Sequence, residues 1–383
     1  MSVLHDSKVK NVGLTESNLL SLSFGRIIRK DIDAVGGLLP ESFETYQIVE
    51  PNQLVFRFTD LQNDQRSLRS ARVTERGIIT SAYVSARATG IDARYAEHLM
   101  RSYDLSKVFY GLGGGVRQSL KFSDIARLPI ILPPAEEQRA IADYLDRETA
   151  SIDTLIKEQQ RLIDTLRERR RAALSAAFSP GPSTDTTRVG RLLSARPSYG
   201  VLVPRYVDET EGVPFVRVGD ILNLATERPL LAIAPEQSTE YSRTKIGGGE
   251  VLLGVVGKMG QATVAPRWLA GANVARAVAV LRCRDVAVAP LLCAWFGSND
   301  FLRQAELATS GDSIQPTLGM KDLARFDINL PTHPHAAADL ASQMAKIDTL
   351  IAEAGRFIEL ARERRSALIT AAVTGRIDVR EAA

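Results

Sequence analysis

The chain has few of the residues that would mark a disulfide-bonded or metal-binding protein. Among 383 residues there are two cysteines, Cys283 and Cys293, and four histidines. The cysteines lie ten residues apart in an apolar region, with no CxxC and no nearby histidine, so they are expected to be reduced core thiols. His333 and His335 flank a proline in a connecting segment and are expected to be exposed. The sequence therefore predicts no metal site.

A long apolar run is also lacking. The first ten residues, MSVLHDSKVK, are polar, and the most apolar later segment, residues 286–296, is short and contains Pro290. Neither has the length of a secretory leader or a membrane span. The sequence predicts a cytoplasmic protein without membrane contact.

Charge of one sign is not in excess. The 48 basic and 45 acidic residues give a net charge of +3, far below the balance that would by itself indicate a nucleic-acid partner. Hydrophobic residues make up 45% and charged residues 24%, which is typical of a globular protein and argues against disorder. The length exceeds that of one usual domain and favours two.

Catalytic signatures are missing as well. There is no GxxxxGK[ST] phosphate loop, because Gly257 and Lys258 lack both the earlier glycine and the following hydroxyl residue. There is no [ND]PP[YF] motif of amino-methyltransferases, no Pro-Asp dipeptide of metal-dependent nucleases and no glycine-rich nucleotide-binding unit. The sequence predicts that this chain is not an enzyme and holds no cofactor.

What the chain does have is an internal repeat, the first feature to seek in a long sequence. Residues 150–177 and 345–372 are identical at 16 of 28 positions, at a constant offset of 195. Upstream, LKFSDIARLPIILP at 120–133 matches LGMKDLARFDINLP at 318–331 with an offset of 198. A weaker match joins residues 19–28 to residues 213–222. The chain therefore consists of two copies of one module.

Each module is expected to be an α+β globular domain followed by a long helix. Short β-branched runs bounded by Gly, Pro, Asn and Asp indicate strands, and residues 289–308 have a helical composition. The predicted organisation is a first domain at 1–133, a first helix at 134–178, a linker at 179–187, a second domain at 188–331, and a second helix with the C-terminal tail at 332–383.

Both helices carry an apolar stripe at spacings of three and four, which is typical of coiled-coil seams. The stripe residues are Leu145, Ile152, Leu155, Leu162, Leu166 and Ala173 in the first helix, and Ile347, Leu350, Ala354, Phe357, Ala361 and Leu368 in the second. The favoured hypothesis is that the two stripes pack on each other as an antiparallel spacer between the domains, related by a pseudo-twofold axis. The alternative is that each helix packs on its own domain.

Taken in this order, the motifs resemble the specificity subunits of type I DNA restriction-modification systems. The resemblance rests on VFRFTDLQ at 55–62, GIITSAY at 77–83 and residues 115–146 in the first module, and on PFVRVGDI at 214–221, GEVLLGVVGKMG at 249–260 and residues 313–331 in the second. It covers nearly the whole chain. One departure is that the first module has no counterpart of VGRLL at 189–193, so that its domain is either incomplete or completed by the C-terminal tail.

The resemblance implies a non-catalytic reader of double-stranded DNA. Each domain would read one half of a bipartite, asymmetric site. Two methylation subunits that use S-adenosylmethionine to methylate adenine would dock on the helices, and two restriction subunits that use ATP and Mg would be able to join them. The near-neutral charge of the helices agrees with protein contacts there.

Residues that could contact DNA are polar side chains on loops and strand edges, because arginine suits guanine and Asn or Gln suits adenine. In the first domain the candidates are Arg57, Gln62, Asn63, Arg66, Arg69, Arg72, Tyr83, Arg117 and Gln118. In the second they are Arg217, Arg243, Lys245, Lys258, Gln261, Asn273, Arg276, Ser313 and Gln315. The RERR runs at 167–170 and 362–365 are expected to form salt bridges within the spacer or with a partner.

Two other functions remain open from the sequence. A coiled-coil adaptor that binds other macromolecules would have the same helices, and an enzyme with an unrecognised site would have the same domains. A sequence-dependent affinity for DNA would separate the first hypothesis from both.

Overall fold

A computed structural model describes residues 3–32, 42–61, 63–64, 67–112, 119–257, 259–309 and 316–379. It divides into two compact units. Unit 1 comprises Met1–Gln159 and Arg356–Ala383, and unit 2 comprises Gln160–Gly355. Among the described residues, no helix combines the length and the apolar composition needed to cross a membrane.

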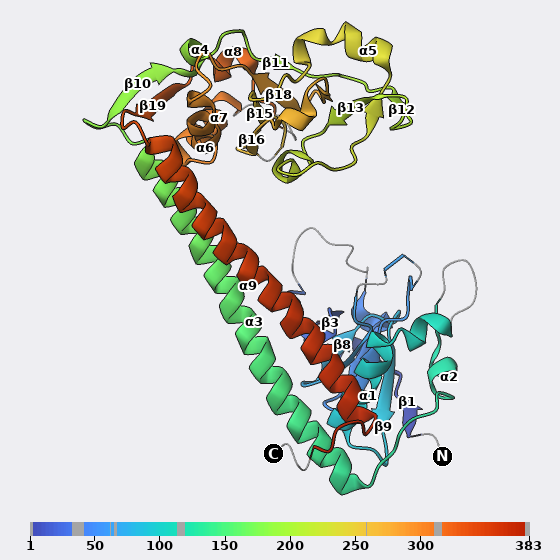
Figure 1. The fold of residues 1–383 in the computed structure, drawn as a ribbon. Helices are drawn as coiled ribbons and strands as arrows, with labels where there is room; N and C mark the ends of the chain where they lie inside the picture. Colours follow the sequence, from blue (N-terminus) through green and yellow to red (C-terminus); the bar gives the residue numbers. More distant parts are fainter. Residues whose placement is uncertain are drawn as a thin grey trace. The chain divides into compact units, whose positions relative to one another are not determined.

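Unit 1 contains an α+β domain (Figure 1). Its strands are β1 (Leu4–Asp6), β2 (Val9–Lys10), β3 (Leu20–Ser23), β4 (Arg26–Arg29), β5 (Gln47–Val49), β6 (Gln53–Phe56), β7 (Ser70–Arg72), β8 (Gly77–Ile79) and β9 (Val84–Ala88). Its short helices are α1 (Ala93–Leu105) and α2 (Phe122–Ile125). Helix α1 begins after Asp92, whose carboxylate accepts the backbone N–H groups of Arg94 and Tyr95, as an N-cap does.

Unit 2 contains a domain built from corresponding elements. Its strands are β10 (Thr184–Arg188), β11 (Ser198–Tyr199), β12 (Tyr206–Val207), β13 (Val213–Val216), β14 (Ala232–Ile233), β15 (Val251–Gly254), β16 (Ala262–Val264), β17 (Asn273–Val274), β18 (Val278–Leu281) and β19 (Asp327–Pro331). Its helices are α4 (Val189–Leu192), α5 (Pro235–Glu240), α6 (Val288–Trp295), α7 (Asn299–Thr309) and α8 (Met320–Leu323). The single helix expected at 289–308 is two helices, α6 and α7.

The two domains share one strand order. The central sheet of unit 1 runs β1-β9-β6-β7, and that of unit 2 runs β11-β18-β15-β16, with antiparallel pairing throughout both. A parallel bridge between Leu19 and Ile78 in unit 1 matches the parallel pairing of β13 with β17 in unit 2. The repeat predicted from sequence identity in the helices therefore extends through the domains.

Two long helices, α3 (Ala135–Ala177) and α9 (Ala336–Val373), contribute to both units. In unit 1, Leu145 of α3 shares a core with Ile369 near the end of α9. In unit 2, Leu166 of α3 shares a core with Ile347 near the start of α9. The helices are thus antiparallel, and the predicted α+β fold with paired long helices is confirmed.

The buried positions of the paired helices repeat at the offset of the sequence. Five buried residues of α3 have buried counterparts at the repeat-related positions of α9: Leu145 and Leu340, Thr149 and Met344, Ile152 and Ile347, Ile163 and Ile358, and Leu174 and Ile369. Positions 145, 149 and 152, and positions 163 and 166 further along, fall on one series of alternating steps of four and three, the spacing of a heptad seam. The internal repeat is therefore a repeat of packing as well as of sequence.

The structure corrects the phase of the predicted seam at four residues. Leu155, Leu162, Leu350 and Phe357 are 42%, 44%, 48% and 42% exposed. Each of them precedes an isoleucine, and Ile163 and Ile358 are buried in their place. Neighbouring helical residues differ by about 100° around the axis, so only one member of each apolar pair can face the partner helix.

The C-terminal tail belongs to unit 1. Helix α9 ends at Val373, and Gly375 follows with φ +68°, a left-handed conformation that glycine adopts without strain. Beyond it, Ile377 and the buried Val379 pack against the core of the first domain. The described part of the C-terminal tail thus contributes to the core of the first domain.

Candidate nucleic-acid interface

In unit 1, the segment that begins at Ser119 lies against the strand end that precedes the polar stretch of the first domain. The backbone N–H of Leu120, which follows the stretch with Arg117 and Gln118, donates to the carbonyl of Phe58 at 3.3 Å. Phe58 lies just past the end of β6, where the polar stretch from Arg57 begins. Segments that are distant in the sequence therefore meet at one edge of the domain.

Unit 2 has the same junction at the corresponding place. Leu318 N–H donates to Val255 O at 2.9 Å, Val256 forms a bridge with Thr317, and Gly257 N–H donates to Pro316 O at 3.4 Å. The segment that follows β15 thus lies against the segment that leads into α8. We call this contact between the segment after the strand and the segment before the short helix the junction edge of each domain.

Arg69 has the most hydrogen-bond partners among the described candidates, but its side chain is fully buried. Its guanidinium donates to the carbonyls of Thr59, at 3.1 Å, Asp60, at 3.4 Å, and Asp64, and to the Tyr110 hydroxyl at 3.2 Å. These bonds hold the backbone that follows β6 at the junction edge. The burial of Arg69 indicates a structural role in place of the predicted contact with DNA.

The other candidates of unit 1 differ in their hydrogen-bond partners and in their exposure. Arg72 is paired with Glu97 at 3.0 Å and bonds Asn52 at 3.1 Å, and the Asn63 amide bonds Asp60 at 2.7 Å. Arg57 and Tyr83 are half-buried. Gln62, Arg66, Arg117 and Gln118 lie outside the described residues.

In unit 2, Asn273 is buried, and its amide lies between two structural partners. Its Oδ1 accepts from Ser238 at 2.6 Å, and its Nδ2 donates to Tyr241 O at 3.1 Å. These bonds indicate a role inside the domain in place of the predicted contact with DNA.

The remaining candidates of unit 2 lie at or near the surface. Arg217, Arg243 and Arg276 are exposed, and Lys245 and Gln261 are half-buried. Arg217 pairs with Asp220 at 3.3 Å across a turn. Lys258, Ser313 and Gln315 lie outside the described residues.

Sequence reasoning missed an arginine that positions two of these candidates. Arg282, half-buried after β18, donates to the carbonyls of Arg243 at 3.0 Å and Lys245 at 2.7 Å. It also lies 3.6 Å from Glu250, whose carboxylate accepts the N–H groups of Gly247 and Gly248. No local signal marks such a residue, because its partners are backbone carbonyls in a distant part of the sequence.

The first domain is fastened to α3 by a charged cluster. His98 Nε2 lies 2.8 Å from Asp146 Oδ1, and Arg94 bonds Asp143 at 2.7 Å and Asp146 at 3.3 Å. Burial alone would raise the pKa of the Asp146 carboxyl, but the hydrogen bond from His98 and the nearby cations outweigh it, and the pKa is lowered. The cluster thus favours the ionised carboxylate.

The paired helices present apolar side chains outward at repeat-related positions. Leu155 and Leu350 are related by the repeat, and so are Leu162 and Phe357; all four are exposed, as is Leu360 at 64%. Of the predicted helix residues, Leu145, Ile152, Leu166 and Ile347 are buried, and Leu368 packs at the edge of the unit 1 core. Among the described residues, no group of three or more potential metal ligands gathers, and His333 and His335 are exposed.

Comparison with known proteins gives a consistent family likeness. The model of the type I restriction modification DNA specificity domain matches residues 93–164. The specificity subunit of the type I restriction enzyme EcoBI from Escherichia coli is 26% identical over 227 residues, covering 52% of this chain and 48% of that one. The match thus spans about half the length of that relative. The resemblance read from the motifs is confirmed.

A solved structure shows the same fold. A chain from a study titled "Structural basis underlying complex assembly and conformational transition of the type I R-M system" superposes with a TM-score of 0.70 and 18% identity, over 96% of this chain and 94% of that one. The HsdS subunit from Thermoanaerobacter tengcongensis gives a TM-score of 0.49 and 18% identity, over 86% and 83% of the two chains.

Proposed function

Because residues 93–164 match the model of the type I restriction modification DNA specificity domain, we propose that this chain is the DNA-reading subunit of a type I restriction-modification complex. Each globular domain reads one half of a bipartite, asymmetric site, and the chain itself performs no chemistry. The observation that carries this proposal is the doubled junction edge, which recurs at corresponding places in two domains with one strand order.

Base and phosphate contacts come from polar side chains on the surfaces of the two domains, some of them near the junction edges. Arginine forks suit guanine and phosphate, and amides suit adenine. The described candidates retained for this role are Arg57, Asn63, Arg72, Tyr83, Arg217, Arg243, Lys245, Gln261 and Arg276. Their backbone positions are fixed in part by Arg69 in one domain and Arg282 in the other.

The paired helices serve as the docking platform for two methylation subunits. Two copies of one partner require two equivalent surfaces, and the repeat-related apolar residues Leu155, Leu162, Leu350 and Phe357 supply them. The methylation subunits bring S-adenosylmethionine and methylate adenine. Restriction subunits that use ATP and Mg join the same complex.

The test is methylome sequencing of a host that expresses this chain with the methylation subunit encoded beside it. The control host expresses the methylation subunit alone. The expected result is a bipartite adenine motif that appears only with this chain. Replacement of residues 188–331 by the second domain of a related subunit is expected to change one half of the motif and leave the other half unchanged.

An unmodified genome despite a stable complex would require a direct DNA-binding measurement with the purified complex. Absence of sequence-dependent binding there would overturn the proposal in favour of a coiled-coil adaptor.

A further inference from the structure

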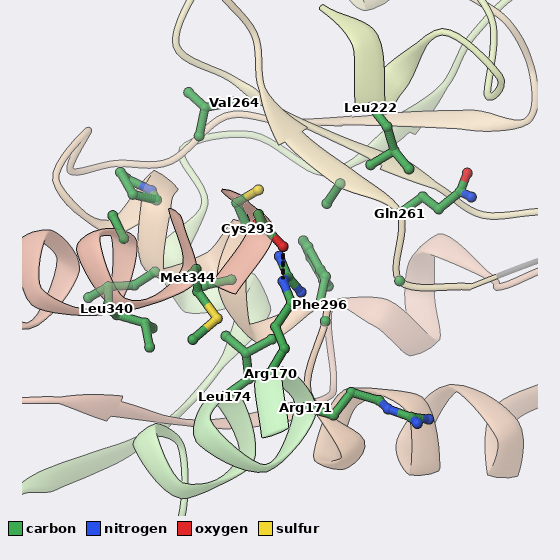
Figure 2. Close-up of a pocket in the computed structure, with 18 of the residues that line it drawn as sticks. Arg170, Arg171, Leu174, Leu222, Gln261, Val264, Cys293, Phe296, Leu340 and Met344 are labelled. Carbon is green, nitrogen blue, oxygen red and sulfur yellow. Dashed lines mark hydrogen bonds and ion pairs between the residues drawn. The ribbon is translucent and has the colours of Figure 1, made fainter. Parts of the chain in front are cut away.

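Unit 2 contains a cleft with a volume of about 940 Å³ where the paired helices meet the second domain. Its walls come from α3, α9, α6 and the segment around β16 (Figure 2). Leu222, which belongs to the short 3-10 helix Ile221–Asn223 (η4), lies at the cleft and is 63% exposed. The cleft therefore lies wholly within one compact unit and is open to solvent.

The floor of the cleft is apolar. It is formed by side chains from several elements, among them Leu174, Leu222, Val264, Phe296, Leu340 and Met344 (Figure 2). Leu174, Phe296, Leu340 and Met344 are themselves buried, and the apolar surface that the cleft exposes comes from Leu222 and from half-buried side chains such as Met259, Val264 and Ile351. Exposed apolar side chains gathered in a cleft are typical of a binding surface for an apolar segment.

The charged residues of the described lining are mainly basic. They are Arg167, Arg170, Arg171 and Asp348. Arg170 lies 2.9 Å from Asp348, so the excess positive charge comes from Arg167 and Arg171. Arg167 has an exposed contact with Asp164 at 3.4 Å, which contributes little. The rim of the cleft is therefore basic.

At the corresponding place in unit 1, the β3–β4 hairpin reaches the paired helices. Asp153, the counterpart of Asp348, pairs with Arg365 at 3.1 Å and also with Arg26 of β4 at 2.5 Å. The turn between β3 and β4 is held in turn by Arg101 of α1, which donates to Gly25 O at 2.5 Å. As a result, the Asp153 side chain is 25% exposed and that of Asp348 is 53% exposed.

We propose that the cleft of unit 2 receives an acidic amphipathic segment of the methylation subunit, and that unit 1 offers no equivalent because the β3–β4 hairpin occupies its place. The inference rests on the proposed function and adds to it that the two docked subunits are held unequally. Apolar side chains of the segment would cover Leu222, Met259 and Val264, and its carboxylates would meet Arg167 and Arg171.

The repeat provides matched variants for the test. The double variant Arg167→Glu, Arg171→Glu reverses the rim charge, and the double variant Arg362→Glu, Ser366→Glu places the same charges at the counterpart positions. Stepwise association of the methylation subunit with the full chain would be followed by native mass spectrometry during titration. Circular dichroism and melting temperature would establish that both variants fold.

The expected result is a loss of about tenfold or more in affinity at one of the two steps for the Arg167/Arg171 variant, since charge reversal in an interface costs affinity. The counterpart variant is expected to leave both steps unchanged. Equal weakening by both variants, or no effect of either, would overturn the inference.

A photocrosslinking measurement tests the same surface without charge reversal. Leu222→benzoylphenylalanine in the assembled complex is expected to react with an acidic segment of the methylation subunit. The control is Ile28→benzoylphenylalanine, at the counterpart position of unit 1, which is expected not to react with that segment. Reaction at position 222 with DNA, or with a non-acidic segment, would overturn the inference.

The two proposals fail in different ways. If the complex methylates a bipartite site but the matched variants do not differ, the proposed function holds and only the inference about the cleft is overturned. Loss of both assembly and DNA binding in the parent chain removes both.

Discussion

The Nε atom of Arg170 lies 2.9 Å from the carboxylate of Asp348, and the same pair recurs with both members displaced by one repeat. Arg365 is the repeat-related counterpart of Arg170, and Asp153 is that of Asp348. The Nε atom of Arg365 lies 3.1 Å from the carboxylate of Asp153. A single relationship between two helices is thus made twice, once in each unit. The surroundings of the two pairs differ, and this difference can be measured.

Replacement of the two aspartates is expected to have unequal effects. Asp348→Ala should lower the free energy of unfolding by about 0.5 kcal/mol, as is usual for an exposed ion pair. Asp153→Ala should cost clearly more, because Asp153 is less exposed and pairs with both Arg365 and Arg26. Urea unfolding of the two variants checks the order, and equal shifts of the midpoint would contradict it.

The phase of the helical seam predicts opposite outcomes at adjacent residues. Ile163→Ala and Ile358→Ala remove buried side chains and should each cost about 2–4 kcal/mol of stability. Leu162→Ala and Phe357→Ala remove exposed side chains and should change stability by about 0.5 kcal/mol or less. Thermal or urea unfolding separates the two sets. If Leu162→Ala were as unstable as Ile163→Ala, the result would contradict a seam that buries Ile163 and exposes Leu162.

Arg69→Gln is expected to lower the sequence specificity for one half of the proposed DNA site. Loss of the guanidinium leaves buried carbonyls without a donor, which should cost about 1–3 kcal/mol of stability. The backbone beyond β6 should then vary in position, so one half of the methylation motif becomes degenerate while the other keeps its sequence. Arg87→Gln, at an exposed position of β9, is the control. A destabilised variant with an unchanged motif would show that Arg69 supports folding alone.

Acid should weaken the attachment of the first domain to α3. The folded-state pKa of Asp146 is lowered, so its contribution to stability is present above the ordinary carboxyl pKa of 3.8 and is lost as the pH falls through the folded value. Asp146→Asn should therefore be less stable than the parent chain at neutral pH. The two should converge below the folded pKa. A stability difference that stays constant down to that pH would assign it to packing.

Much of the fold could be predicted because the two modules have similar sequences, so each element was indicated at two places in the chain. Sixteen identities in 28 positions marked both long helices, and a similar offset between the preceding segments indicated that the two domains are also related. The phase of the seam could not be predicted in the same way. Leu162 and Ile163 are equally apolar neighbours, and only the direction of approach of the partner helix decides which one is buried.

The candidate site was harder to predict because burial of a polar residue depends on distant partners. Arg69 stands in a polar stretch and resembles a surface arginine, yet its hydrogen bonds involve Tyr110, which lies beyond the whole of helix α1 in the sequence. Asn273 is enclosed by Ser238 and Tyr241 in the same way. The cleft of unit 2 joins side chains from residue 167 to residue 351, which no local pattern brings together.

Arg69 bonds carbonyl oxygens, and every amino acid has one. Substitutions at Thr59, Asp60 or Asp64 would therefore leave those acceptors in place while changing the side chains displayed there. The hydrogen bonds that hold this backbone therefore do not depend on which side chains the segment carries. Such an anchor would keep the backbone beyond β6 in place while the side chains displayed there change one at a time.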